Sequence, residues 1–173
     1  MGHILSSYLH ERKQCTKVGS TISLVLVTTK GIPQGSVLSP FLFNYYVLDL
    51  NAYLQIPTTP QFVDDTSILV VVQNLLALEL KSQVVLDKLA GWSYLNSFLI
   101  NHTKTKYLIM FKRITMEKLR LVINNQCINE VNQATLLGLT IQNSLKWDIQ
   151  ASKVIAKLSQ VLGFVYRNVQ QLF

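Results

Sequence analysis

Two aspartates stand side by side, Asp64 and Asp65, inside the apolar, β-branched stretch QFVDDTSILVVV. Adjacent carboxylates repel each other, and side chains at successive strand positions point to opposite faces of a sheet. A tight turn, which aspartate tolerates, would let both carboxylates converge at the tip of a hairpin. Mg²⁺ would relieve their repulsion, since it favours one or two carboxylates together with substrate phosphates and water. Taken alone, the dipeptide is also compatible with a plain surface turn.

A loop rich in glycine and proline, GIPQGSVLSP, precedes the aspartates at residues 31–40. Gly31 and Gly35 leave backbone without side chains, so that a base pair or a phosphate could approach closely. Gln34 between them offers both a hydrogen-bond donor and an acceptor. Such a loop is weak evidence when it stands alone, but its place before the aspartate pair favours a binding site over a simple turn.

Short strands and amphipathic helices must position these residues. Apolar periodicity predicts helices over residues 3–10, 39–54, 74–96 and from 148 to the C-terminus. β-Branched runs predict strands over 20–28, 98–100, 106–111 and 136–141, and hairpins over 61–72 and 119–128. The hairpin tips are expected at Asp64–Asp65 and at Asn124–Asn125. The sum is an α+β fold, a small antiparallel sheet with helices packed on one face.

Local signals predict where the helices begin and which faces they bury. Ser39 followed by Pro40 predicts a capped start with proline at the first helical position, and Asn74 predicts a second cap. Residues at spacings of three and four predict a buried stripe on the helix after Asn74, formed by Leu75, Leu78, Ser82, Val85, Leu89 and Trp92. A similar stripe on the last helix consists of Ala151, Ile155, Leu158, Leu162, Val165, Val169 and Leu172. Trp92 is therefore expected in the core rather than as a base-stacking platform.

The composition is apolar and basic. Charged residues make up 14% of the chain, against about 25% in typical soluble domains, which favours a piece of a larger protein over a merely apolar domain. The 16 Lys and Arg against 9 Asp and Glu give a net charge of +7. This excess suits a phosphate backbone, although a solubility charge would look the same. A local concentration comprises Lys104, Lys106, Lys112, Arg113, Lys118 and Arg120.

Several protein classes are disfavoured. Cys15 and Cys127 lack the spacing of a zinc site or of a disulfide framework. The N-terminus shows no signal-peptide pattern, and no stretch approaches the ~18 uninterrupted apolar residues of a membrane span. We therefore expect an intracellular protein, in the nucleus or the cytoplasm, that does not cross a membrane.

Four sequence blocks point to a known family. In order along the chain they read GIPQGSVLSPFLFNYYVLDL, FVDDTSILV, WSYLNSFLINHTKTKYLIMF and LLGLTIQNSLKWDIQ. This ordered set resembles the reverse transcriptases of non-LTR (LINE-type) retrotransposons over roughly residues 3–172. The earlier stretch SSYLHERKQ also resembles the family's S-Y-L-x-x-R-x-Q sequence, which precedes the PQG block.

The resemblance implies a fold and an activity. Residues 1–146 are expected to form a partial polymerase palm, and residues 147–173 to begin the first helix of a thumb. The implied activity is RNA-directed DNA polymerisation, the two-metal attack of a primer 3′-hydroxyl on a dNTP along an RNA template. The partners would be an RNA template, a DNA primer and a dNTP, and the cofactor Mg²⁺, with Mn²⁺ possible.

The resemblance also assigns residues to the site. Asp64 and Asp65 match the metal-binding pair of the family's F/Y-A-D-D motif, and Phe62 matches the aromatic residue near the primer end. Lys104 lies in the N-x-x-K-T motif near the nucleotide phosphates, as a charge partner or proton donor, although a solvated loop lysine would look the same. The loop against the incoming nucleotide would comprise Pro33, Gln34, Gly35 and Ser36, the N-x-x-K-T motif Asn101, Lys104 and Thr105, and the primer-gripping strand Leu137 and Gly138.

The chain departs from the family pattern in several places. Val63 stands where the family usually has Ala, Leu48 where Asn is expected before Asp49, and Gln150 where a His is common. The strand motif with the first catalytic Asp does not occur in this sequence, and the fingers and any endonuclease are also expected to be absent.

Three hypotheses follow. The first is a reverse transcriptase fragment that is inactive alone, with the missing N-terminal part of the polymerase as a possible partner. The alternative is a non-catalytic remnant of a retrotransposon that binds nucleic acid or protein, and a third is a fragment that does not fold stably.

Overall fold

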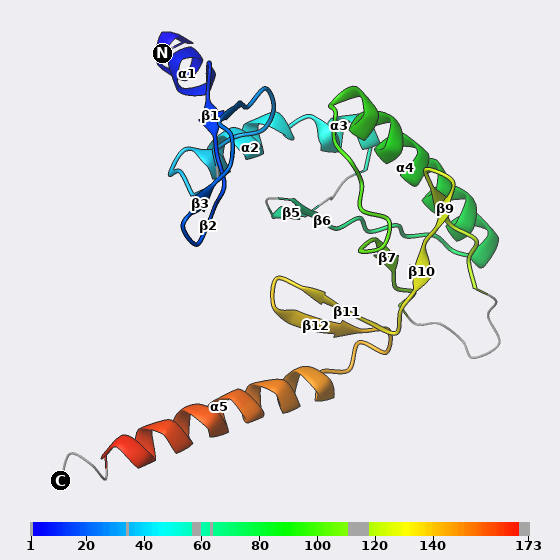
Figure 1. Ribbon diagram of the computed structural model, residues 1–173. Helices are drawn as coiled ribbons and strands as arrows, with labels where there is room; N and C mark the ends of the chain where they lie inside the picture. The colour runs from blue at the N-terminus through cyan, green and yellow to red at the C-terminus, as the bar shows by residue number, and fades with distance from the viewer. Residues whose placement is uncertain (1, 34, 57–59, 63, 111–117, 170–173) are drawn as a thin grey trace.

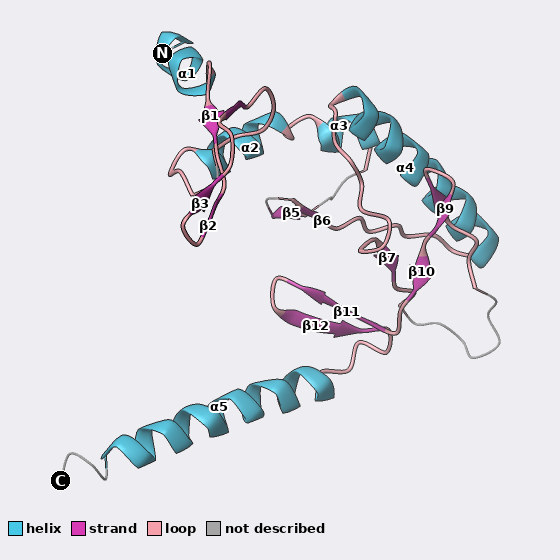
Figure 2. Cartoon of the chain, viewed as in Figure 1, coloured by secondary structure: helices cyan, strands magenta, loops and turns pink. Residues whose placement is uncertain are grey.

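The computed structural model describes residues 2–33, 35–56, 60–62, 64–110 and 118–169. Figures 1 and 2 show short helices and strand pairs, with the long helices α4 and α5 set apart from each other. The helices are α1 (Gly2–Leu9), α2 (Ser39–Tyr46), α3 (Leu50–Leu54), α4 (Leu75–Leu95) and α5 (Asp148–Val169). The strands are β1 (Lys13–Gln14), β2 (Lys17–Val18), β3 (Thr21–Ile22), β4 (Leu26–Val27), β5 (Gln61–Phe62), β6 (Asp65–Thr66), β7 (Lys106–Tyr107), β8 (Val122–Ile123), β9 (Gln126–Cys127), β10 (Asn129–Glu130), β11 (Gln133–Leu136) and β12 (Leu139–Gln142).

Within the described residues the strands form separate pairs rather than one sheet. β1–β4, β2–β3, β5–β6, β8–β9 and β11–β12 are antiparallel, and β7–β10 is parallel. Most strands contain only two residues, and no pair in this part of the chain is joined to a third strand. The predicted α+β class is confirmed, whereas the predicted single antiparallel sheet is wrong for this part of the chain.

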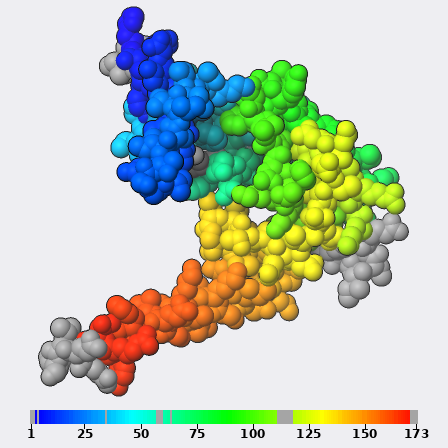
Figure 3. All heavy atoms as spheres, viewed as in Figure 1, coloured from blue at the N-terminus to red at the C-terminus, as the bar shows by residue number. Residues whose placement is uncertain are grey.

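Helix α5 extends away from the other elements, as its orange to red spheres show in Figure 3. Its apolar periodicity is confirmed, but none of its residues is buried, and Leu172 lies outside the described residues. The helix contacts β12 at its beginning, where Thr140 is only 2% exposed. Thr140 N donates to Gln150 Oε1 at 2.9 Å, and Lys153 Nζ donates to Thr140 Oγ1 at 2.8 Å. No described helix meets the length and apolarity needed to cross a bilayer.

The predicted strand over 20–28 is divided into β3 and β4. Between the β2–β3 and β1–β4 pairs, the two residues Cys15 and Thr16 lie opposite the three residues 23–25. Ser23 bridges this irregular segment, because its Oγ accepts from Thr16 N at 2.9 Å and its own N donates to Thr16 O at 2.9 Å. An extra residue on one strand breaks the ladder in the manner of a β-bulge.

The predicted helix over 39–54 is also divided, into α2 and α3. Leu50 N donates to Val47 O at 3.2 Å, a tighter connection than an α-helical bond. The break leaves Asp49 Oδ1 to accept from Trp92 Nε1 at 3.1 Å, and Asp49 does not cap α3. The predicted cap at Ser39 is wrong, because the N-cap position is Leu38 and the Ser39 hydroxyl donates to Pro33 O instead.

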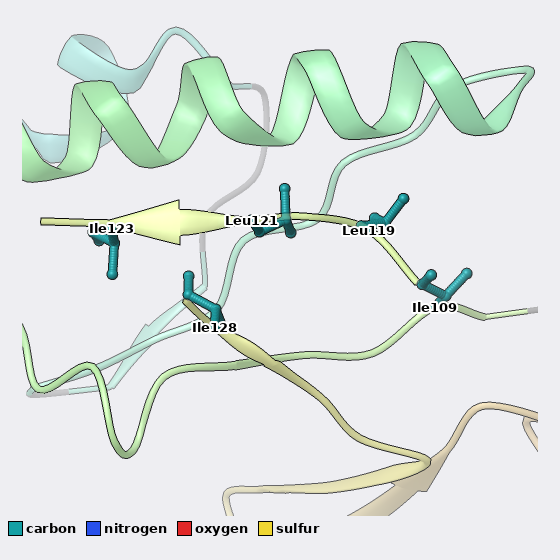
Figure 4. Packing of buried hydrophobic residues seen from close by; sticks show 5 residues of the cluster. All are labelled: Ile109, Leu119, Leu121, Ile123 and Ile128. Atoms are coloured by element: carbon teal, nitrogen blue, oxygen red, sulfur yellow. The ribbon is translucent and has the colours of Figure 1, made fainter. Parts of the chain in front are cut away.

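Helix α4 organises the hydrophobic core. The predicted cap is confirmed, since Asn74 Oδ1 accepts from Ala77 N at 2.8 Å. One cluster of buried residues beside α4, shown in Figure 4, consists of Ile109, Leu119, Leu121, Ile123 and Ile128. The other consists of Val47, Leu50, Leu54 and Trp92. Leu89 of α4 packs against both clusters, and the burial of Val85 and Trp92 confirms the centre of the predicted stripe.

A side-chain amide joins α4 to β8. Gln83 Oε1 accepts from Val122 N at 2.9 Å, and Gln83 Nε2 donates to Val122 O at 2.8 Å. The hairpin β8–β9 that follows is the predicted one. Asn124 and Asn125 form its turn with φ values of 49° and 61°, as the two-residue turns favoured in hairpins require.

Two predicted strands differ from the structure. Residues 98–100 form no strand, because the Phe98 ring instead stacks on Trp92, with centroids 5.5 Å apart and an interplanar angle of 14°. The predicted strand over 136–141 is a hairpin, β11–β12, and its turn interrupts the apolar run. The strand predicted over 106–111 is present as β7 over Lys106–Tyr107, and Phe111 lies outside the described residues.

Tyr107 makes the stability of the fold depend on pH in the alkaline range. Burial raises the pKa of Tyr107 above its ordinary value of 10.0, and the nearby Glu130 carboxylate raises it further. The Tyr107 hydroxyl also donates to Leu119 O at 3.0 Å. The unfolded chain therefore releases the proton at a lower pH than the folded chain. The contribution to stability is complete below about pH 10 and is lost as pH rises through the folded pKa.

We expect the free energy of unfolding to fall more steeply from about pH 9 to about pH 11 in the wild type than in Tyr107→Phe. Urea denaturation followed by circular dichroism measures this slope. Tyr94→Phe is the matched control, because Tyr94 is 84% exposed, and it should keep the wild-type slope. Identical slopes for all three proteins would contradict the prediction.

Candidate functional site

The two aspartates lie at the turn of the hairpin β5–β6. The register pairs Phe62 with Asp65, so Asp64 lies in the turn between the two strands. The predicted tip at Asp64–Asp65 is therefore displaced by one residue, because Asp65 already belongs to β6; Val63 lies outside the described residues. Both aspartates are exposed, and in the described part of the chain neither carboxylate forms a hydrogen bond or an ion pair.

The donor chemistry of this pair suits a hard divalent cation. Carboxylate oxygens are the ligands that Mg²⁺ takes from proteins, usually one or two together with water and phosphate oxygens. Among the residues that the structure describes, no three His, Cys, Asp or Glu side chains gather closely enough to hold a metal ion. In its residue types, the hairpin can therefore supply two of the ligands of a magnesium site.

The described residues of the loop after Gly31 have two glycines with positive φ and a hydrogen-bonded serine. Gly31 and Gly35 have φ values of 80° and 81°, in the left-handed region that favours glycine. A Cβ atom built on either would meet no atom within 4 Å, so the space beside both is open. Ser36 Oγ accepts from Leu38 N at 3.3 Å and from the Tyr8 hydroxyl. Gln34 lies outside the described residues, so its predicted contact with a base pair stays a prediction.

Asn101 and Thr105 shape the turn that carries Lys104. Asn101 Oδ1 accepts from Thr103 N at 3.1 Å and from Thr103 Oγ1 at 2.7 Å. Thr105 Oγ1 donates to Asn101 O at 2.9 Å, which closes the turn. The Lys104 side chain is exposed. The motif therefore has a structural role for its Asn and Thr, which leaves the lysine as its free charge; Lys112 and Arg113 of the basic concentration lie outside the described residues.

Leu137 and Gly138 are not part of a strand. They form the two-residue turn of the β11–β12 hairpin, with φ values of 48° and 82°, and Leu137 is 59% exposed. The prediction of a strand here is wrong because the apolar run hides the turn, whose backbone requires a positive φ. The alternative of Leu137 as a core residue is wrong as well.

The hairpins that carry the aspartates and Leu137–Gly138 are oriented alike in the view of Figure 1. In Figure 1 the turns of β5–β6 and β11–β12 point to the same side of the view. No hydrogen bond or ion pair within the described ranges joins the aspartates to Ser36 or to Lys104. Phe62 is 60% exposed beside the turn. The hairpin therefore presents these side chains on an exposed surface rather than in an enclosed pocket.

Sequence reasoning missed the supporting residues. Asp49 accepts from the indole of Trp92, and the signal was available, because a buried indole N–H needs an acceptor. Arg12 donates from its guanidinium to Gly31 O and to Leu9 O, the second at 3.4 Å. In the sequence, the resemblance of SSYLHERKQ to the family marks this segment, but that resemblance implies no role for Tyr8 or Arg12.

Comparison with known proteins gives concordant matches. The model of a family described as reverse transcriptase (RNA-dependent DNA polymerase) matches residues 3–141. A Drosophila melanogaster protein named "Probable RNA-directed DNA polymerase from transposon BS" is 27% identical over 150 residues, which cover 82% of this chain and 17% of that protein. The "RNA-directed DNA polymerase from mobile element jockey", from the same organism, is 25% identical over 149 residues, or 82% of this chain and 16% of that protein. No solved structure matches.

Proposed function

This chain belongs to the reverse transcriptase family as a reverse transcriptase domain of a retrotransposon, and we propose that it forms part of the catalytic palm of an RNA-directed DNA polymerase. The observation that carries the proposal is the β5–β6 hairpin, which has two adjacent exposed carboxylates, Asp64 in its turn and Asp65 at the start of β6, neither of them in an ion pair within the described chain. Residues 1–146 would belong to the palm, and residues 147–173 would begin the thumb. The chain spans about a sixth of the length of these relatives, so the activity of a whole polymerase is itself a proposal.

The residues divide into those that hold the metal and those that position the reactants. Asp64 and Asp65 would hold Mg²⁺, or Mn²⁺ in its place. The bound ion supplies charge neutralisation at the transferring phosphate and at the attacking 3′-hydroxyl of the primer. Lys104 would place its ammonium near the nucleotide phosphates, on the turn that Asn101 and Thr105 form. Phe62, beside the carboxylates, would contact the primer end.

The nucleotide would lie against the loop that contains Pro33, Gln34, Gly35 and Ser36. Two glycines with positive φ and open space beside them allow a flat base pair to approach the backbone. The exposed turn of Leu137 and Gly138 would contact the primer strand as a loop rather than as a strand edge. The nucleic acids would be an RNA template and a DNA primer.

We expect divalent cations to bind at this hairpin. Phe62 is paired with Asp65, and Thr66 follows Asp65 in β6. A titration with Mn²⁺ should therefore broaden the amide resonances of Phe62 and Thr66 before those of the rest of the chain. The double substitution Asp64→Asn with Asp65→Asn should weaken binding by about tenfold or more, because it removes both charged ligands. Asp87→Asn is the control, since Asp87 lies on the exposed side of α4. Equal broadening in the double variant would contradict the proposal.

The 173-residue chain alone should give no template-dependent product. The hairpin supplies two adjacent carboxylates, and no group of three possible metal ligands occurs among the described residues. Losing one ligand of a three-carboxylate site removes charge where transition-state stabilisation is greatest. The assay is primer extension on a primed RNA template with Mg²⁺ and all dNTPs, with an active reverse transcriptase as positive control. A product that disappears in Asp64→Asn would overturn this expectation.

A second candidate function is binding of nucleic acid without catalysis. The net charge of +7 favours it, since basic residues bind a phosphate backbone irrespective of sequence. Exposed basic residues occur along the described chain, among them Lys13, Lys17, Lys30, Lys104, Lys106, Lys146, Lys157 and Arg167. This function needs no complete metal site, so it is compatible with an inactive chain.

A further inference from the structure

The loop proposed to receive the nucleotide is hydrogen-bonded to two other segments of the chain. The loop starts at Gly31 and passes Ser36 before it enters α2. The other two segments are α1 and the base of the N-terminal hairpin, where Arg12 immediately precedes β1. The contacts among them come from two side chains, Tyr8 and Arg12, to which no role is assigned in the proposed function.

Arg12 holds the start of the loop. Its guanidinium donates to Gly31 O and, at 3.4 Å, to Leu9 O at the end of α1. The backbone of Arg12 is itself fixed, because its carbonyl accepts from Thr28 N at 2.7 Å. One planar side chain thus bridges a helix end and a loop from a position that the hairpin determines. Arginine suits this arrangement, since its donors point in fixed directions whereas a lysine ammonium acts as a point charge.

Tyr8 holds the end of the same loop. Its hydroxyl donates to Ser36 Oγ, and Tyr8 and Ser36 are both partly buried. Ser36 transmits this contact to α2, because its Oγ accepts from Leu38 N at 3.3 Å and its carbonyl accepts from Ser39 N at 3.2 Å. The Tyr8 hydroxyl is therefore bonded to the residue that orders the last turn of the loop.

We propose that Tyr8 and Arg12 are positioning residues, which fix the two ends of the loop between Gly31 and Ser36 and so determine how its backbone meets a nucleotide. The functional part rests on the proposed function, whereas the positioning itself does not. Two glycines make this loop conformationally free in the unfolded chain, and ordering it only at the moment of binding would weaken affinity. Contacts at both ends would lower this cost, because they restrain the ends of the loop before binding.

The test uses amide exchange in the full chain by NMR. In Tyr8→Phe, exchange of the Leu38 and Ser39 amides should accelerate by about 3- to 10-fold, the effect of losing one net hydrogen bond. The Ala77 and Ile128 amides, which are bonded elsewhere, should not change. In Arg12→Lys the Ile32 amide resonance should move, because the Gly31 carbonyl in the same peptide unit loses its donor. Tyr46→Phe is the matched control, since it removes a hydroxyl that donates to Asn96 O at 3.0 Å, away from the loop.

A second measurement separates positioning from simple packing. Titration with Mg²⁺ and dATP should show about 3- to 10-fold weaker nucleotide binding in Tyr8→Phe than in the wild type, at an unchanged urea midpoint. Unchanged exchange at Leu38 and Ser39, or equal nucleotide affinity in both proteins, overturns the inference. If the wild type binds no nucleotide, the proposed function fails for this chain, and the exchange rates alone decide whether Tyr8 and Arg12 order the loop.

Discussion

Replacing Trp92 by alanine lowers the free energy of unfolding by about 3–5 kcal/mol, the range for removing a large aromatic residue from a core. Trp92 is 4% exposed and packs with Val47, Leu50 and Leu54. Its ring stacks on Phe98, and its indole N–H donates to Asp49 Oδ1 at 3.1 Å. Alanine would remove the stacking surface and leave Asp49 without this donor, so that packing and hydrogen bonding are lost together.

The chain supplies its own control for this substitution. Trp147, the second of two tryptophans, is 59% exposed, and Trp147→Ala should change the free energy of unfolding by no more than about 0.5 kcal/mol. Urea denaturation of both variants, followed by circular dichroism, gives the comparison. The same experiment tests whether the chain folds by itself, because a wild type without a cooperative transition would contradict this prediction and favour a fragment that does not fold stably.

Binding to an RNA–DNA duplex should weaken steeply with salt. If four basic residues contact phosphates, the expected slope of about −0.9 per contact lowers the affinity roughly 150-fold between about 50 and 200 mM salt. Fluorescence anisotropy with a labelled duplex measures this slope. Absence of binding at low salt would exclude the nucleic-acid-binding hypotheses for this chain, with or without catalysis.

Single substitutions then locate the contacts. Lys104→Gln should reduce the magnitude of the salt slope by about 1 and weaken binding to all sequences alike, as the loss of a phosphate contact does. Lys88→Gln is the matched control, because the Lys88 ammonium donates to Gln55 Oε1 at 2.7 Å within the fold. Equal slopes for the two variants would place the duplex away from the Asn101–Thr105 turn.

Local signals in the sequence were sufficient where a feature depends on neighbours in the chain. The cap at Asn74, the helix that follows it and the Asn124–Asn125 turn were all predicted, because a cap or a two-residue turn is decided within a few residues. The predicted Ser39 cap failed for a tertiary reason, since the carbonyl of Pro33 takes its hydroxyl. The strand predicted at residues 98–100 failed similarly, because Phe98 is used to cover Trp92.

The candidate site was predicted in its residue types but not in its geometry. The aspartate hairpin is present, displaced by one residue, because alternation of side chains alone does not specify which two residues form the turn. Leu137 and Gly138 fall within the strand predicted over 136–141, since a positive φ at leucine cannot be recognised in an apolar run. The roles of Tyr8 and Arg12 could not be predicted, because each depends on a partner at least 19 residues away in the chain. For Asp49 the sequence indicates only that the indole of Trp92 needs an acceptor, not which residue supplies it.

Helix α5 acts as a lever arm. Its 22 residues make it about 33 Å long at 1.5 Å per residue, and among the described helices and strands it contacts only β12. A rotation of about 10° around Thr140 would therefore displace the far end of the helix by roughly 6 Å. The two hydrogen bonds that join Thr140 to Gln150 and Lys153 thus help to fix the direction of the helix, and small changes at β12 are amplified along it.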